Sequence, residues 1–319
     1  MTAIQKEDSN ILLSIIIVNY NGKHHLKGCL DSLRNHLIGV NAEVILVDNA
    51  SVDGSVNYIK DKYPWVNLIQ SATNKGFTGG NNLGAMAAKG QYLLLLNNDT
   101  VTESSFKPML DILEMNPHVG VVGCMLQYGD GRLQESIGHE HTPLSIPLSW
   151  MGLGGWFTKN HFLSRTFHSS SLIYSSSFAE CAWISGACLL TRRDLWARIG
   201  GLDEAYFMYV EDVDYCRSVR ALGYKIVYTQ DVLITHYEGG GRVWIGERAL
   251  LNTINSYEIY SGKFFSKSGA CVMRGGLATV FFLRSVLYKI LSLVKKNDVM
   301  KDKSLAYFRG SRNLIVVNK

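Results

Sequence analysis

The stretch Ile11-Leu12-Leu13-Ser14-Ile15-Ile16-Ile17-Val18-Asn19-Tyr20-Asn21-Gly22 decides the fold. Residues 11–18 form an almost unbroken apolar and β-branched run, which is typical of a parallel strand that is buried on both faces. The run ends in the polar turn 19–22. Open α/β sheets bind their ligands at the carboxyl ends of strands, so this turn is a candidate binding site.

The pattern of the first strand recurs through the N-terminal half. Further strands are predicted at 43–47, 66–70 and 92–96, with helices at 26–37 and 83–89 between them. This alternation predicts an α/β fold with a mostly parallel, doubly wound sheet. Later in the chain, apolar runs at 183–190 and 225–229 predict two more strands.

Polar residues also end the second and fourth of these strands. Asp48 follows the second, and Asn97-Asn98-Asp99 follow the fourth. A carboxylate at this edge of a sheet suits a hard cation beside phosphate groups. An acid after a strand is also a common helix N-cap, and residues 100–115 are predicted to be helical.

Glycines concentrate at 74–84 (Asn-Lys-Gly-Phe-Thr-Gly-Gly-Asn-Asn-Leu-Gly). Neither a G-x-G-x-x-G after the first strand nor a G-x-x-x-x-G-K-[ST] is present, which disfavours dinucleotide and P-loop sites. We predict a loop ahead of the 83–89 helix that brings backbone N–H groups close to a ligand. The alternative is a flexible turn.

Three acids stand close together in 207–217 (Phe-Met-Tyr-Val-Glu-Asp-Val-Asp-Tyr-Cys-Arg). Apolar spacing predicts a helix at 209–222, and this places Asp212 near the helix N-terminus, where the dipole favours its ionised form. A positioned, ionised carboxylate can serve as a general base. The alternative is an acidic helix start that faces solvent.

Taken together and in this order, these motifs resemble the bacterial family-2 glycosyltransferases with the GT-A fold, and among them the rhamnosyltransferase-like branch. The stretches that carry the resemblance are 14–22, 47–51, 74–84, 97–99, 183–187, 200–204, 211–214 and 236–240. The resemblance implies a GT-A sheet with a helical C-terminal extension. It also implies a nucleotide-sugar donor, with Asp48 reading the pyrimidine ring. The donor-binding residues that it implies are Asn19, Tyr20, Asn21, Asp48, Asn74, Gly76, Phe77, Asn81, Asn97, Asn98 and Gly186.

The resemblance implies a divalent cation, Mg²⁺ or Mn²⁺, held by Asp99 and His236. Asn97 stands where the family's D-x-D motif has its first acid, which removes one charge from the site. Asp212 matches the catalytic base of a single inverting displacement, with Glu211, Asp214 and Trp183 supporting the base or contacting the acceptor. Without the resemblance, His236 is a surface histidine after a strand.

The function implied is transfer of a sugar, with rhamnose from dTDP-rhamnose favoured, to a hydroxyl of a glycan or polyisoprenyl-linked glycan. The product would belong to a bacterial surface polysaccharide such as lipopolysaccharide O-antigen. Alternatives are a UDP-hexose or UDP-GlcNAc donor, a sugar-1-phosphate nucleotidyltransferase, and a non-catalytic nucleotide-sugar-binding protein. A nucleotidyltransferase carries a basic glycine-rich loop after the first strand, and 19–22 is not one.

The domain organisation expected is a flexible N-terminus at 1–10, a nucleotide-sugar half at 11–127, an acceptor and catalytic half at 128–245, and a basic helical extension at 246–319. Residues 128–178 lack periodicity but are rich in aromatic side chains, which suggests an acceptor-side flap or variable packing. His139 and His141 lie there without a third metal ligand.

Charge and composition bound the partners. The chain has 319 residues, 47% of them hydrophobic, and a net charge of +5; residues 263–319 hold twelve Lys or Arg against two Asp. The apolar segment 276–294 has Ser285, Lys289, Ser292 and Lys296 on one helical face and apolar side chains on the other. Peripheral contact with an anionic membrane through 276–296 is expected, or else packing on the domain or in a homodimer. No nucleic acid partner is expected.

Six cysteines without a Cys-x-x-Cys pair indicate a reduced, cytoplasmic setting at the inner face of the plasma membrane.

Overall fold

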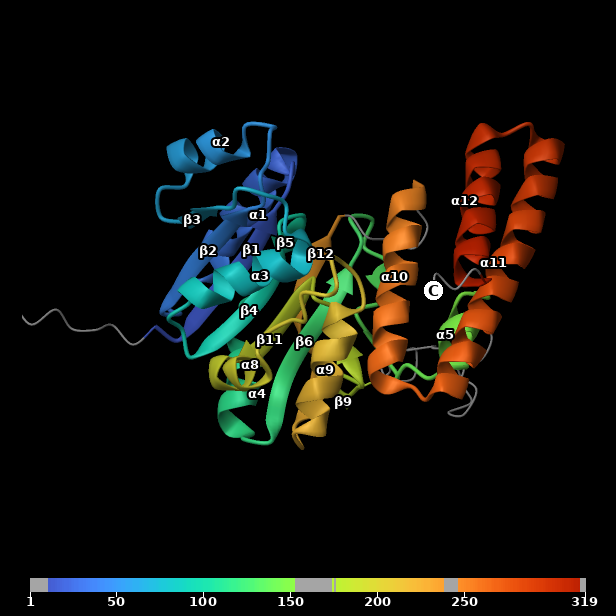
Figure 1. The fold of residues 1–319 in the computed structure, drawn as a ribbon. Coiled ribbons are helices and arrows are strands. Elements are labelled where there is room, and N and C mark those ends of the chain that lie inside the picture. The colour runs from blue at the N-terminus through green and yellow to red at the C-terminus, as the bar shows by residue number, and fades with distance from the viewer. Residues whose placement is uncertain (1–10, 153–173, 175, 238–245, 316–319) are drawn as a thin grey trace, which may run out of the picture.

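A single mixed sheet forms the centre of the molecule (Figure 1). The computed structural model describes residues 11–152, 174, 176–237 and 246–315. The strands are β1 (Leu13–Asn19), β2 (Ala42–Asp48), β3 (Asn67–Gln70), β4 (Tyr92–Asn97), β5 (Thr100–Thr102), β6 (Val119–Gln127), β7 (Leu133–Gln134), β8 (Ile137–Gly138), β9 (Phe178–Glu180), β10 (Trp183–Ile184), β11 (Cys188–Arg192) and β12 (Lys225–His236). The main order is β3-β2-β1-β4-β11-β6-β12-β5.

The N-terminal part of this sheet is parallel and the rest is mixed. Strands β1, β2, β3 and β4 pair in parallel, as do β6 and β12, whereas β11 runs antiparallel to β4 and β6. The predicted fold class, an α/β sheet that is mostly parallel and followed by C-terminal helices, is confirmed. β10 and β8 form a separate two-stranded sheet.

Helices cover both faces of the main sheet. They are α1 (Lys23–His36), α2 (Ser55–Lys62), α3 (Gly76–Ala87), α4 (Lys107–Met115), α5 (Ser145–Ser149), α8 (Arg193–Ile199), α9 (Glu211–Ala221), α10 (Gly246–Phe264), α11 (Lys267–Lys295) and α12 (Asp298–Ile315). α1 and α4 pack in one core with Ile15 and Ile17 of β1, while α3, α8 and α9 pack in the other core with Ile16. Alternate residues of one strand therefore feed two cores, which is the doubly wound arrangement.

A third core joins the C-terminal helices to the catalytic half. It combines side chains of α10, α11 and α12 with Ile146 of α5 and with Tyr206, Val210 and Val213. In Figure 1, α11 and α12 form an antiparallel pair at one side of the molecule, with α10 between that pair and the sheet. The extension is thus packed against the segment that carries the acids at 211–214.

The glycine-rich stretch 74–84 is helical, so the prediction of a loop there was wrong. α3 begins at Gly76 and lies directly on the sheet. A Cβ on Gly80 would lie 2.7 Å from Val18 Cγ1, and one on Gly84 would lie 2.5 Å from Ile16 Cγ2. These two glycines therefore serve close helix–sheet packing.

The helix predicted at 100–115 was also wrong in its first third. Residues 100–102 form β5, which pairs with the end of β12, and α4 begins only at Lys107, with Pro108 in its first turn. Proline suits that position because its missing N–H is not needed there.

The segment 183–190 is two strands rather than one, broken at 185–187. There the Ser185 N–H donates to Ser136 O (2.7 Å) and the Asn97 N–H donates to Ala187 O (3.0 Å). Residues 1–10, most of the aromatic segment predicted as a flap and residues 238–240 lie outside the described residues.

Candidate active site

The carboxyl ends of β1, β2 and β4 meet, as the sequence predicted. The register aligns Asn19 with Asp48 and Val18 with Asn97. Asn19 Nδ2 donates to Asp48 Oδ2 (3.1 Å), and Asn19 Oδ1 accepts from Asn98 Nδ2 (2.7 Å). The polar residues that end three strands are therefore one hydrogen-bonded network.

Asp48 orders the turn that follows β2. Its side chain is 2% exposed, and while one oxygen accepts from Asn19, the other accepts from the Ser51 N–H (2.9 Å). Asn21, in a left-handed conformation (φ 52°), accepts from the Val52 N–H (2.8 Å). Tyr20 is 53% exposed on the same edge. An exposed ring beside a rigid turn offers a face for stacking a base.

Asn49, which the sequence reasoning did not single out, fixes the start of α3. Its Nδ2 donates to Gly76 O (2.8 Å) and to Asn74 Oδ1 (3.1 Å), and its Oδ1 accepts from the Lys75 N–H (3.0 Å). Asn81 is buried and donates to Phe77 O (2.9 Å), inside the helix. Asn49 and Asn81 thus hold in place the helix N-terminus that faces the donor edge.

Asp99 and His236 lie together at the same edge. β5 pairs with β12 and brings His236 opposite Thr100, and His236 Nε2 lies 3.1 Å from Asp99 Oδ1. His236 is buried, so its reading as a surface histidine was wrong. On its other side, His236 Nδ1 lies 3.2 Å from Gln134 Oε1. A donor hydrogen bond from Nδ1 leaves the Nε2 lone pair directed toward Asp99 and Asn97.

These groups fit a divalent cation. Asp99 Oδ1 is buried and accepts no hydrogen bond, and the Asn97 amide lies 3.1 Å from His236 Nε2. Burial acts to raise the pKa of Asp99, but the His236 ring and local backbone N–H groups outweigh it, so the pKa is lowered. No cluster of three His, Cys, Asp or Glu occurs among the described residues. A cation here would take its remaining ligands from phosphate oxygens and water, which suits Mg²⁺ and Mn²⁺.

Asp212 lies in the first turn of α9, as predicted. Its Oδ2 accepts from the Gly186 N–H (2.9 Å) and its Oδ1 accepts from the Val213 N–H (2.8 Å). Burial raises the pKa of Asp212 above its ordinary value, although these two N–H groups act in the opposite direction. A carboxylate with a raised pKa is a stronger proton acceptor once it is ionised.

A strained turn delivers Asp212 to this place. Tyr209 (φ 73°) and Val210 (φ 67°) are both left-handed, which is unfavourable for a β-branched residue such as valine. The Phe77 N–H donates to Phe207 O (2.9 Å), and a Cβ on Gly76 would lie 2.2 Å from that oxygen. The turn 207–210 is therefore docked on the N-terminus of α3.

The three residues proposed to support the base have different surroundings. Glu211 is buried with no hydrogen bond to Oε2, and burial together with the charge of Asp212 raises its pKa well above the ordinary value. Asp214 pairs with Lys263 of α10 instead of contacting Asp212. Trp183 donates from Nε1 to His139 O (3.0 Å). Of these three, Asp214 has a structural partner outside the site.

Short contacts connect the cation side to the base side. The Asn97 N–H donates to Ala187 O (3.0 Å), and the next residue back, Gly186, donates its N–H to Asp212. The Phe77 ring lies against Gly186, where a Cβ would be 2.9 Å from Phe77 Cζ. The strand end that carries Asp99, the start of α3 and the start of α9 thus meet at one edge of the sheet.

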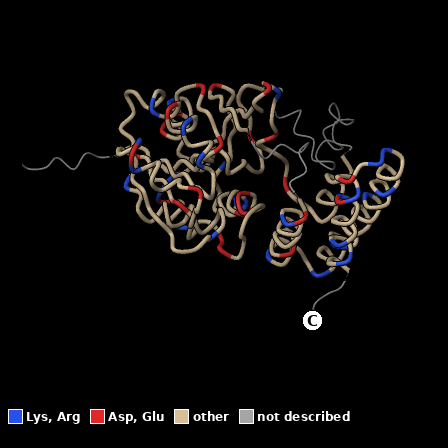
Figure 2. The backbone as a smooth tube through the Cα atoms, turned by 90° about the horizontal axis from the view of Figure 1, so that it is seen from above, with Lys and Arg blue, Asp and Glu red and all other residues tan. Residues whose placement is uncertain are grey.

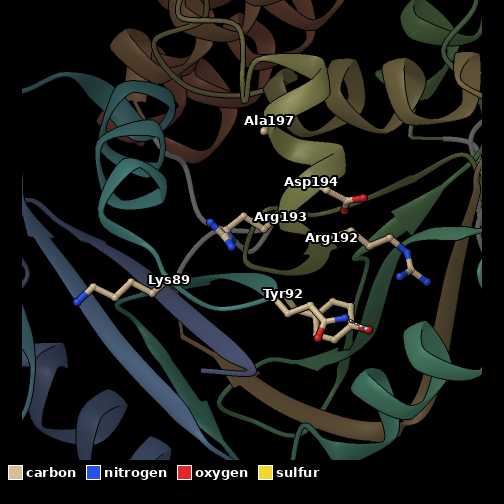
Figure 3. Close-up of a pocket in the computed structure, with 7 residues that line it drawn as sticks. Lys89, Tyr92, Arg192, Arg193, Asp194 and Ala197 are labelled. Carbon is tan, nitrogen blue, oxygen red and sulfur yellow. Dashed lines mark hydrogen bonds between the residues drawn. The ribbon is translucent and has the colours of Figure 1, made fainter. Parts of the chain in front are cut away.

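A cavity of about 570 Å³ lies at the opposite edge, around the start of β4 and the end of β11 (Figure 3). Lys89, Tyr92, Arg192 and Arg193 line it. The Arg192 guanidinium donates to the carbonyls of Val119 and Leu113, so it caps neighbouring elements. This cavity contains none of the predicted site residues.

A nucleotide-binding sheet edge with an Asp–His pair and a separate carboxylate defines a nucleotide-sugar-dependent glycosyltransferase of the GT-A type. The model of the family described as "Glycosyl transferase family 2" matches residues 14–193, and the chain belongs to that family. It is therefore an enzyme of this class, which excludes the nucleotidyltransferase alternative.

Two curated relatives and one solved structure are similar to the chain. An N-acetylglucosaminyl-diphospho-decaprenol L-rhamnosyltransferase of Mycobacterium tuberculosis is 28% identical over 71% of this chain and 76% of its own length. An uncharacterized protein of Sinorhizobium fredii is 28% identical over 72% of this chain, which spans only 25% of that protein. The structure of a Pyrobaculum calidifontis mannosyltransferase with GDP-Man and Mn²⁺ is 14% identical, with a TM-score of 0.56, and covers 98% of this chain and 89% of its own. This last likeness shows the fold.

Proposed function

We propose that the enzyme transfers rhamnose from dTDP-rhamnose, with inversion, to a hydroxyl of a glycan or polyisoprenyl-linked glycan in bacterial surface polysaccharide synthesis. The observation that carries the reaction class is Asp212, held by two backbone N–H groups at the same sheet edge as Asp99 and His236. The name of the mycobacterial relative supports rhamnose and a lipid-linked acceptor.

In this mechanism the donor nucleotide lies over the turn that Asp48 orders and against the start of α3. The Asn19–Asn98 pair and the Asn49 contacts hold these segments before the donor arrives, so little ordering is left to binding. Tyr20 stacks on the base. Asp99 and His236 hold the cation, which, when bound, neutralises charge on the diphosphate leaving group.

Ionised Asp212 accepts the proton of the acceptor hydroxyl. The acceptor oxygen then forms a bond to the anomeric carbon as the bond to the diphosphate oxygen breaks, and the nucleoside diphosphate leaves from the opposite face. The Gly186 and Val213 N–H groups keep the carboxylate oriented throughout. Glu211, protonated beside it, adds no second negative charge to the site.

A panel of nucleotide sugars tests the donor. Purified enzyme with Mn²⁺ and a lipid-linked GlcNAc acceptor is assayed for released nucleoside diphosphate and for the mass gained by the acceptor. We expect kcat/KM for dTDP-rhamnose to exceed that for UDP-GlcNAc and UDP-glucose by at least about 100-fold, because a site built to hydrogen-bond one sugar leaves polar groups unpaired with another. A UDP-sugar as best substrate would overturn the rhamnose assignment but keep the reaction class. Binding of a donor without transfer to any acceptor would favour the non-catalytic alternative.

A further inference from the structure

The outward face of α11 is apolar. The sequence placed one polar and one apolar face on this helix, and the polar one would ordinarily face water. The structure has the reverse: Ser285 and Ser292 are buried, while the apolar face is exposed. The exposed apolar side chains of α11 are Val272, Phe282, Leu283, Val286, Leu287, Ile290, Leu293 and Val294, with exposed fractions of 42–75%.

Packing against α12 explains this inversion. Ser304 Oγ of α12 donates to Ser285 O (2.9 Å), and Ser311 Oγ donates to Ala278 O (2.9 Å). Gly310 faces Phe281, where an added Cβ would lie 3.4 Å from Phe281 Cδ2. Small side chains let the two helices approach closely, so α12 occupies the face with the serines. The apolar face is left without a partner among the described residues.

Charge is absent from the centre of this face and abundant around it. Arg284 lies inward, where its Nη1 donates to Tyr307 OH (3.0 Å) and its guanidinium lies 5.9 Å from the Trp150 ring centroid. Lys289, Lys295 and Lys296 are exposed beside the apolar face. Figure 2 shows the C-terminal helices carrying mostly Lys and Arg. An apolar strip bordered by cations fits a surface that is apolar below and anionic above.

This distribution also disfavours the two other occupants of such a face. A second copy of the chain would bring like-charged lysine borders together, which opposes association. A spanning orientation would require every face of the helix to meet lipid. α11 is long and apolar enough to cross a bilayer by length and composition, but its opposite face, with Met273, Leu277 and Phe281, is fully buried against the rest of the chain.

We propose that α11 lies flat in the interface of an anionic membrane, with the Phe282–Val294 face among the acyl chains and the neighbouring lysines at the lipid phosphates. The protein then holds its active site at a fixed height, because α10 joins this helix pair to the catalytic turn. Ser256 Oγ of α10 donates to Met208 O (2.9 Å), and Lys263 pairs with both Asp203 (2.8 Å) and Asp214.

Flotation of the full chain with vesicles tests the proposal without any assay of transfer, so its outcome is independent of the proposed function. We expect binding to vesicles of phosphatidylcholine mixed with phosphatidylglycerol, and binding at least about tenfold weaker to phosphatidylcholine alone. The variant Leu283→Glu/Leu287→Glu/Ile290→Glu should lose at least about tenfold in vesicle affinity, because three apolar side chains become charged.

A matched control changes the same number of exposed apolar residues to Glu elsewhere, as Ile38→Glu/Met86→Glu/Met115→Glu. These side chains are 77–85% exposed, so the change in net charge is equal and the fold should tolerate it. Equal loss in both triple variants would reduce the effect to net charge and overturn the proposal. A wild-type dimer in the absence of lipid that the α11 variant converts to monomer, with vesicle binding unchanged, would assign the face to a second copy instead. Circular dichroism and Tm verify that each variant is folded.

Discussion

Two carboxylates at one edge of the sheet have opposite electrostatic environments. Asp99, beside His236, has a lowered pKa, whereas Asp212, at the start of α9, has a raised one. Both are largely buried, so burial alone does not separate them. The difference is that Asp99 has a histidine neighbour, while Asp212 relies on two backbone N–H groups and has the acidic Glu211 next to it.

This contrast indicates how the two acids divide the work. A group that remains ionised suits a cation, and a group poised to take a proton suits a base; pairs of acids whose pKa values are pushed apart are typical of active sites. The two regions are also built differently. The Asp99 side consists of strand ends linked by amide side chains, whereas the Asp212 side depends on the strained turn at 209–210.

Replacing Asp212 should give the largest effect. Asp212→Asn removes the proton acceptor but keeps the size of the side chain, so we expect kcat to fall about 10³-fold or more. Donor affinity, measured by calorimetry, should change little. Asp214→Asn, two residues along the same helix, is the control: it loses its Lys263 ion pair and should lower Tm with only a small change in kcat. A similar kcat for Asp212→Asn and the wild type would remove the assigned base.

The cation side should respond to the amide that orients His236. Gln134→Leu removes the acceptor beside Nδ1, and we expect Mn²⁺ affinity to fall about 10–100-fold, as for other partners of metal-binding histidines. Asp99→Asn should lower it further. Titration of activity with Mn²⁺ after EDTA treatment measures both. Transfer that continues in EDTA would take Asp99 and His236 out of this role.

The contact between α3 and the catalytic turn can be tested at Gly76. Gly76→Ala places a methyl group against Phe207 O at a left-handed position (φ 71°), so the turn must shift. We expect kcat to fall about tenfold to 100-fold, since small displacements of a catalytic group are costly. Gly262→Ala, in open space on α10, should instead raise stability by about 0.5–1 kcal/mol. Equal kcat in Gly76→Ala and wild type would show that the docking does not matter for transfer.

The smallest effect concerns stability and pH. Because the pKa of Glu211 is raised in the folded state, that state binds the proton more tightly than the unfolded chain. The stability of the wild type should therefore be greatest below the unfolded pKa and fall as pH rises toward the folded pKa. Glu211→Gln should remove this decline, so its Tm should exceed that of the wild type by an increasing margin at higher pH. Parallel Tm curves for the two proteins would contradict the raised pKa.

Sequence patterns predicted the sheet and most of the site because those features are local. A strand is an apolar run, and the residue that ends it lies at the sheet edge, so Asn19, Asp48 and Asp99 could be placed from the chain alone. Asp212 was predicted by its place at a helix start. Order along the chain also identified His236, but only through the family resemblance, since its burial depends on the pairing of β12 with β5.

What was missed depends on contacts between distant segments. The glycines at 80 and 84 look like a loop until Val18 and Ile16 are seen against them. The exposed apolar face of α11 depends on which side α12 occupies, and serine–serine contacts decide that. Gln134 and Asn49 gave no signal in the sequence, because an amide that orients a neighbour has no characteristic spacing.

A crystal structure of the wild-type chain with Mn²⁺ and dTDP tests the central claim most directly. We predict an anomalous manganese peak between Asp99, His236 and the diphosphate, with the pyrimidine against the turn at 48–51 and the Asp212 carboxylate facing the β-phosphate across room for one sugar. Manganese and nucleotide bound elsewhere, for example in the cavity lined by Lys89 and Arg193, would contradict it.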